Sequence, residues 1–445
     1  MSDPTPDKEL SKVVGSEVAA GLTRWARSNG MEIILPANGW TARGFTDAFV
    51  TSLIVRDPDN GDFSLALKVA GEHARSERET HEKALMEAPE EFRANHLVEL
   101  EHGVIELDGG RIGYFQSLAG GSSRVRPVAD LSSAAQHKAA VATCIAASDG
   151  LTNKWNTAPF VTRKSTVREF LRREVGHLSG GGTLGSLGRW AASTGWGDLN
   201  GRPLRVTGEA VRERVLPDPL LLLGEHPLGA CEITVHTGYS HGDLHLGNLL
   251  VPTDDRGTRP ERYRLIDLST YQSAGPRSRD LAALLTSGLA LLWPGLGPTY
   301  QEFLLDDVAN FDGEVPERQD KPVLDLIRGV PGVMTAEATR RGFEHEWRVE
   351  FTLALLAAAL RSTTHENLDP ELRWWFVQLA GRLTARYLEI EGVAMSQKPP
   401  VEFSNPFPGH RPSPTTAAST TSRPDEVPRL RGLLLGGMST RDADR

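Results

Sequence analysis

A dense group of polar residues at positions 241–248 constrains the fold more than any other part of the sequence. It reads His-Gly-Asp-Leu-His-Leu-Gly-Asn, and Asp267 follows Asn248 nineteen residues later. Short apolar runs at 249–251 and 263–266 flank a polar turn, which predicts a β-hairpin. A hairpin puts Asn248 just before one strand and Asp267 just after its partner. Both side chains are therefore expected at the same end.

The residue types in this cluster suit chemistry beside a metal ion. Asn248 and Asp267 offer hard oxygen ligands, which Mg²⁺ prefers together with phosphate oxygens. Asp243, five residues before Asn248, can accept a proton from a hydroxyl next to that ion. Two alternatives stay open: a polar loop in which these residues meet by chance, and a metal hydrolase that uses His241, Asp243 and His245 as ligands. The hydrolase alternative assigns no role in the site to Asn248 or Asp267.

The cluster resembles the catalytic loop of the aminoglycoside phosphotransferase and choline-kinase branch of the protein-kinase-like superfamily. That loop reads H-G-D-x-H-x-x-N, and each of its defined positions is present here. Segments 266–268 (Ile-Asp-Leu) and 275–282 (Gly-Pro-Arg-Ser-Arg-Asp-Leu-Ala) are similar to the family's I-D-x and G-P-x-x-x-D-L-A segments. The resemblance implies ATP or GTP as donor, Asp243 as catalytic base and Asn248 and Asp267 as Mg²⁺ ligands. It implies that His241, His245 and Asp280 support the loop structurally.

The resemblance also requires a nucleotide-binding lobe with a lysine on a central strand. Residues 49–55 and 63–69 read as two strands joined by the turn 57–61. Lys68 ends the run Leu-Ala-Leu-Lys, which is close to the kinase V-A-I-K pattern. Alternation places small Ser64 and Ala66 on the lysine's face, which leaves room for a nucleotide. The alternative is a surface lysine on an edge strand.

A glutamate on the next helix is expected to pair with Lys68. This helix is predicted from about Ser76 until Pro89 stops it. The E-R-E pattern points to Glu79, and Glu82 is the alternative partner. Ser76 and Glu79 also have the spacing of a capping box, which would give Glu79 a purely structural role.

Two further segments are expected to contact the nucleotide. The turn at 39–48 contains two glycines before a strand, which predicts phosphate contacts around Gly44, Phe45 and Thr46. The strand at 111–117 is expected to lead into the hinge between lobes, where backbone groups near Gln116 and Leu118 would meet the base. The G-x-G-x-x-G match at 180–185 follows a helical stretch and is interpreted as a connection.

The resemblance implies an α+β, two-lobed protein-kinase-like fold, and the β-rich and helical patterns along the chain agree with it. We expect an N-terminal helical extension at 1–30 (one helix over 8–28), a small β-rich lobe at 31–118, a larger helical lobe at 119–395, and a disordered tail at 396–445. Eight of the 28 prolines lie in that tail, whose last stretch is either a docking peptide for a protein partner or a frayed end.

Charge and cysteine content limit the partners and compartment. The net charge of −9 argues against nucleic-acid or anionic-membrane binding, and the longest apolar stretch, 281–293, is too short for a bilayer. Two cysteines and no signal peptide favour a cytoplasmic protein.

The expected activity is phosphoryl transfer from ATP or GTP to an acceptor hydroxyl. Protein kinases usually have arginine where this chain has Gly242, and only 12 residues separate Asp267 from Asp280. Both departures favour a small-molecule acceptor, with protein still open. The acidic stretch at 302–320 suits a polycationic acceptor or is a solvated surface. Two different functions also stay open: a nucleotide-binding module of a bacterial multi-component signalling or conflict system, and the metal hydrolase.

Overall fold

The computed structural model describes residues 8–403 with several gaps. The positions left out within this range are 38, 40, 44–48, 72, 118–124, 159, 177–182, 195, 197–200, 209–210, 255–256, 314–319 and 397. The expected contacts at Gly44, Phe45, Thr46 and Leu118 lie outside the described residues, as does the chain after 403.

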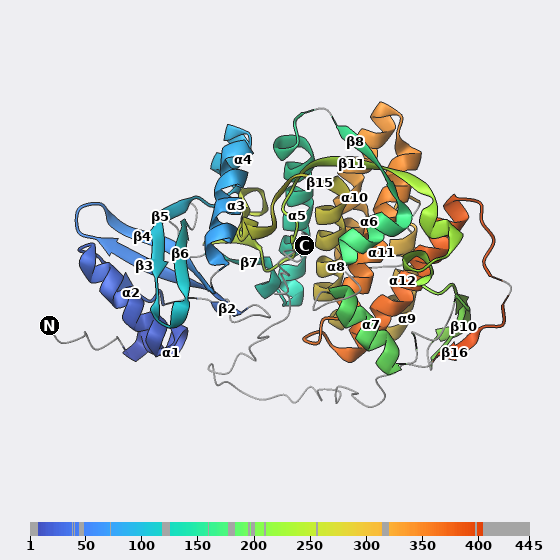
Figure 1. The fold of residues 1–445 in the computed structure, drawn as a ribbon, viewed down its shortest axis with the longest axis horizontal. Helices are drawn as coiled ribbons and strands as arrows, with labels where there is room; N and C mark the ends of the chain where they lie inside the picture. Colours follow the sequence, from blue (N-terminus) through green and yellow to red (C-terminus); the bar gives the residue numbers. More distant parts are fainter. Residues whose placement is uncertain are drawn as a thin grey trace.

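An antiparallel sheet of six strands forms the smaller part of the molecule (Figure 1). Its main path is β1-β3-β4-β6-β5, and β2 pairs with β3. The strands are β1 Glu32–Ile34, β2 Thr41–Arg43, β3 Phe49–Asp57, β4 Gly61–Ala70, β5 Leu100–Glu106 and β6 Ile112–Ser117. The helices α3 Ala74–Glu87 and α4 Glu90–His96 connect β4 to β5. The predicted hairpin and the following helix are confirmed.

The N-terminal extension is two helices, so the prediction of one helix over 8–28 is wrong. α1 spans Lys8–Val14 and α2 spans Ser16–Ser28. The break falls at Gly15, whose φ of 87° is a left-handed conformation that a helix interior does not contain. Leu10 and Leu22 pack with Leu53 and Leu67 of the sheet. The extension therefore covers the sheet face opposite Lys68.

Helices dominate the larger part of the chain. They are α5 Ala134–Asp149, α6 Val167–Val175, α7 Thr183–Thr194, α8 Arg277–Leu292, α9 Pro298–Ala309, α10 Lys321–Arg341, α11 Glu344–Thr363 and α12 Pro370–Ile390. α8 and α11 are buried along most of their length and pack against each other. Asp369 caps α12 by accepting a hydrogen bond from the Glu371 amide at 2.7 Å.

Several short strands interrupt these helices, more than the sequence pattern indicated. They are β7 Val125–Pro127, β8 Val161–Thr166, β9 Leu204–Gly208, β10 Val211–Leu216, β11 Glu232–Ser240, β12 Leu249–Asp254, β13 Gly257–Thr258, β14 Arg264–Leu265, β15 Gln272–Pro276 and β16 Val401–Phe403. β16 pairs with β9 in parallel, so 401–403 are ordered within the expected tail. β11 lies between β8 and β15 and leads into the polar cluster.

The α+β prediction with a β-rich first part and a mainly helical second part is confirmed. In Figure 1 the six-stranded sheet, together with α1 and α2, forms the left part of the molecule, and the helices α8 to α12 form the right part. α3 and β7 lie between these two parts. No helix in the described ranges has the length and apolarity needed to cross a membrane.

Candidate active site

The polar loop at 241–248 is held in place by Asp280 in the first turn of α8. One carboxylate oxygen of Asp280 accepts a hydrogen bond from the His241 amide at 2.6 Å, and the other accepts from the Gly242 amide at 3.0 Å. Asp280 is buried, and burial raises the pKa of its carboxyl. Both oxygens are thus committed to backbone amides, in agreement with a supporting role.

Close backbone packing explains the glycine at position 242. Gly242 has a φ of 86°, and a Cβ at this position would lie 2.2 Å from the Thr270 carbonyl oxygen. Thr270 also donates its hydroxyl hydrogen to the His241 carbonyl at 2.9 Å. The loop therefore packs directly on segment 268–270, where a side chain at 242 has no room.

The two histidines of the loop use their ring nitrogens within the chain. His241 Nε2 donates to the Ile266 carbonyl at 2.8 Å, and its Nδ1 accepts from the Asp243 amide at 3.4 Å. His245 Nδ1 accepts from the Gly247 amide at 3.0 Å, and burial lowers the pKa of His245 to about 3. Among the described residues, no three His, Cys, Asp or Glu side chains are placed to hold a metal ion together. These contacts favour structural support over the ligand roles of the hydrolase alternative.

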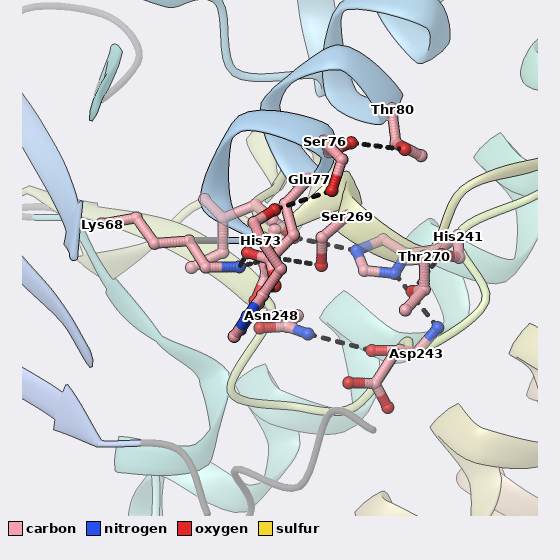
Figure 2. A network of polar contacts seen from close by, with 12 residues as sticks. Lys68, His73, Ser76, Glu77, Thr80, His241, Asp243, Asn248, Ser269 and Thr270 are labelled. Carbon is pink, nitrogen blue, oxygen red and sulfur yellow. Dashed lines mark hydrogen bonds and ion pairs between the residues drawn. The ribbon is translucent and has the colours of Figure 1, made fainter. Parts of the chain in front are cut away.

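Asn248 and Asp267 lie at the same end of a hairpin, as the sequence predicts. Leu249 pairs with Leu265, and the Ile266 amide donates to the Asn248 carbonyl at 3.1 Å. The Asn248 side-chain amide donates to the Asp243 carbonyl at 2.9 Å (Figure 2). That bond uses the nitrogen, so the Oδ1 of Asn248 is the atom suited to a cation.

Asp267 takes a backbone conformation that is uncommon for a residue with a side chain. Its φ is 58° and its ψ is 58°, the left-handed region. Its Oδ1 accepts hydrogen bonds from the Ser269 hydroxyl at 2.7 Å and from Lys68 Nζ at 2.5 Å. Although burial works in the opposite direction, the Lys68 charge and these hydrogen bonds hold the pKa of Asp267 below its usual range.

Lys68 connects the sheet to this hairpin. Its side chain is 6% exposed, and its Nζ lies 2.5 Å from Asp267 Oδ1 and 2.8 Å from Glu77 Oε2. Burial alone would lower the pKa of Lys68, but the charges of Asp267 and Glu77 raise it above its usual value. The lysine is therefore a buried cation between two carboxylates, and the surface-lysine alternative is wrong.

The partner of Lys68 on α3 is Glu77, which corrects the predicted Glu79 and its alternative Glu82. α3 begins at Ala74, two residues before the predicted start, and its buried residues include Ala74 and His81. Glu77 follows Ala74 by three positions and lies on the same face. Glu79 is exposed, and Glu82 pairs with Arg78 at 3.0 Å. The N-cap is His73 without a side-chain cap bond, so the capping box does not form either.

The Asp243 carboxylate points away from this network (Figure 2). Within the described part of the chain it accepts no hydrogen bond, and the neutral ring of His245 has its Nε2 3.9 Å from Asp243 Oδ2. Burial raises the pKa of Asp243 to about 6, while His241 and Arg361 lower it. A carboxylate of this kind is free to accept a proton near neutral pH.

A small apolar cluster occupies the face of the sheet that bears Lys68. Ala66 packs with Val98 and with two residues of the hairpin, Leu250 and Ile266. Gln116 is paired with Ala66 in the sheet and is buried. The predicted base-binding strand is therefore beside Lys68, and its exit toward the hinge is not described beyond Ser117.

Three carboxylates of the acidic stretch at 302–320 are paired within the fold, which disfavours an open acidic surface at these three positions. Glu302 pairs with Arg214 at 2.5 Å. Asp306 pairs with Arg382 at 2.8 Å, and Asp312 pairs with Arg386 at 3.3 Å. These carboxylates connect α9 and its following turn to β10 and α12. They offer little open negative surface to a polycation.

Besides Glu77, three residues of the site were not identified from the sequence. Ser269 and Thr270 follow Asp267 directly, and their hydroxyl groups at this position were the available signal. Arg361 lies more than 100 residues further along the chain than Asp243, and no local pattern marks it.

Comparison with known proteins gives a distant likeness in fold. No protein-family model matches the sequence, and no curated protein matches it. One similar solved structure is an aminoglycoside phosphotransferase from Alicyclobacillus acidocaldarius, with 12% identity and a TM-score of 0.34 over 77% of this chain and 89% of that one. Another is a spectinomycin phosphotransferase in complex with ADP and spectinomycin, with 13% identity and a TM-score of 0.29 over 78% of this chain and 92% of that one. TM-scores this low do not support a residue-by-residue comparison.

Proposed function

We propose that this chain is a phosphotransferase that moves the γ-phosphoryl group of ATP or GTP to a hydroxyl of a small-molecule acceptor. The observation that carries the proposal is the buried contact of Lys68 with Asp267, 199 positions apart, beside an uncommitted Asp243. This arrangement combines a phosphate-binding cation, oxygen ligands and a proton acceptor at one place.

The donor set at the hairpin fits one magnesium ion. Asn248 offers an amide oxygen because its nitrogen is bonded to Asp243, and Asp267 offers a carboxylate whose pKa is low. Mg²⁺ prefers few protein ligands together with phosphate oxygens, and it would neutralise charge on the transferring phosphate.

The chain's own residues supply positioning and proton transfer. Lys68 orients the donor phosphates, and Glu77 holds the lysine in place. The acceptor hydroxyl gives its proton to Asp243 while its oxygen forms the new bond to the γ-phosphorus. The bond from the γ-phosphorus to the bridging oxygen breaks, and the nucleoside diphosphate leaves with that oxygen.

The segment between Asp267 and Asp280 supports a small acceptor. A short turn at Leu268–Thr270 and the strand β15 fill it. β15 pairs with β11, with Gly275 opposite Gly238. A segment committed to a sheet leaves no long loop on which a protein substrate would rest.

Substitution of Asp243 tests the proposal. Asp243→Asn keeps the shape and removes the base, so phosphoryl transfer should fall about 10²–10⁴-fold. The rise in melting temperature on adding Mg·ATP should stay near the wild-type value, since Lys68, Asn248 and Asp267 are intact. Transfer is measured with labelled nucleotide against a panel of hydroxyl compounds.

Asp267→Ala is the matched variant that tests whether Asp267 binds magnesium. It should abolish the magnesium-dependent part of the thermal shift, because it removes a carboxylate ligand and a partner of Lys68. Unimpaired transfer by Asp243→Asn would refute the catalytic assignment. A magnesium-dependent shift that survives in folded Asp267→Ala would refute the metal assignment.

A further inference from the structure

The guanidinium group of Arg361 lacks a partner within the described part of the chain. Arg361 lies in the last turn of α11 and is half-buried. Among the residues that the structure describes, its side chain makes no hydrogen bond and no ion pair. A partly buried charge is costly to leave alone, and arginine is always charged. This side chain is therefore available to bind an anionic ligand.

Arg361 lies close to the catalytic loop. α11 packs against β11, the strand that leads into the loop. The charges near Arg361 include those of Glu174, Asp243 and Asp280. The guanidinium thus lies near Asp243 and near the carboxylate that supports the loop, Asp280.

Two of these three carboxylates already have partners. Glu174 forms a two-bond ion pair with Arg279, at 2.6 and 2.8 Å. Asp280 accepts the two loop amides described above. Asp243 is the carboxylate left over, and it does not form an ion pair with Arg361. An arginine and a carboxylate that lie near each other without an ion pair can both contact the same bound ligand.

The neighbouring imidazoles add polar groups without adding charge. His365 lies one turn beyond Arg361, and burial, with Arg361 and His245 nearby, lowers the pKa of His365 to about 4. Burial likewise lowers the pKa of His245 to about 3. Both rings are neutral at pH 7. The other arginine close to Asp243, Arg279, is paired with Glu174, whereas Arg361 has no ion-pair partner among the described residues.

We propose that Arg361 binds an anionic group of the acceptor, a carboxylate or a phosphate, and thereby places the acceptor's hydroxyl at Asp243. The planar guanidinium matches both anions with two parallel hydrogen bonds. The acceptor class is then a hydroxy acid or a phosphorylated alcohol or sugar. The acidic stretch at 302–320 agrees, because three of its described carboxylates, Glu302, Asp306 and Asp312, are paired with arginines of the fold. This inference rests on the proposed function for the identity of the ligand as acceptor.

Thermal shifts with matched probes test the inference. The probes are glycerol, glycerate and glycerol 3-phosphate, and the larger set glucose, glucosamine, gluconate and glucose 6-phosphate, each with and without Mg·ADP. At least one anionic compound of a set should stabilise the wild type, while the neutral and cationic compounds should not. The glycerate and phosphate arms separate the two anions.

Variants of Arg361 give the decisive comparison. Arg361→Gln should weaken binding of the stabilising anion by about tenfold or more, and Arg361→Lys should weaken it less, since lysine keeps the charge but loses the two-bond geometry. Arg340→Gln is the control for net charge, because Arg340 is exposed on α10 and pairs with Glu337. It should leave anion binding unchanged.

The outcomes separate this inference from the proposed function. If Mg·ADP gives no shift but an anion binds through Arg361, the phosphotransferase proposal fails and the anion site stands. If Mg·ADP binds while no anion is preferred, or while Arg361→Gln binds the anion like wild type, the anion site is refuted. Should Arg361→Gln not fold, the ranking of probes on wild type and on Arg361→Lys decides.

Discussion

Glu77 and Glu79 lie two positions apart on α3, and only Glu77 reaches Lys68. Glu77→Gln removes one of the two carboxylates around a buried ammonium, so turnover should fall about tenfold or more, with a lower melting temperature. Glu79→Gln changes an exposed side chain and should shift stability by less than about 0.5 kcal/mol. Steady-state kinetics and thermal unfolding of both variants check this pair. A larger defect in Glu79→Gln would contradict the Lys68–Glu77 ion pair.

The polar cluster at 241–248 could be identified from the sequence because its residues are close together in the chain. Asp243 and Asn248 sit five positions apart, and the hairpin brings Asp267 back to them. Arg361 was not predictable, because its position depends on how α11 packs against β11. Glu77 was missed for a smaller reason. A shift of two residues in the start of a helix changes which side chain faces inward.

At the scale of elements, local alternation and turn residues predicted β3, β4 and the hairpin after Asn248. The sheet β15-β11-β8 was not predicted, since its pairing is long-range. His236 lies opposite Thr162, and Gly238 lies opposite Gly275. Such strands are stabilised by neighbours distant in sequence, and their own short patterns are weak.

The position of strand β16 predicts where the chain can be truncated without loss of stability. The Val401 amide donates to the Pro203 carbonyl at 2.8 Å, and Glu402 pairs with Arg205 at 3.1 Å. A chain ending at 403 should melt at nearly the temperature of the full chain, since the residues beyond are rich in proline and polar residues. A chain ending at 396 loses β16 and should melt about 2–4 °C lower. Calorimetry on both forms tests this; equal melting temperatures would show that β16 contributes nothing.

At the scale of the whole molecule, buried histidines should make the fold sensitive to acid. Burial lowers the pKa of His81 and of His96 to about 4, and both are almost fully enclosed. The unfolded chain binds protons to these rings near pH 6.5, and the folded chain does not until about pH 4. Their contribution to the free energy of unfolding is therefore complete above pH 6.5, and it is lost as the pH falls toward 4.

As the pH falls through that window, each of these histidines should lower the free energy of unfolding by about 1.4 kcal/mol per pH unit. Denaturant unfolding at pH 7 and pH 5 measures the loss. His96→Gln, in the ring stack with Tyr263, should flatten the pH dependence, whereas the exposed His345→Gln should not. A stability that does not change between pH 7 and pH 5 would contradict the enclosed, neutral state of these rings.

The backbone packing at Gly242 limits which residues can replace this glycine by a single mutation. Protein kinases usually carry an arginine here, through which a phosphorylated loop switches activity on. In this chain the backbone is left-handed at 242, and any Cβ would collide with the Thr270 carbonyl. Acquiring that arginine requires rebuilding segment 268–276 first. A single mutation at 242 therefore cannot introduce that arginine without displacing the Thr270 carbonyl, so two segments of the chain would have to change together.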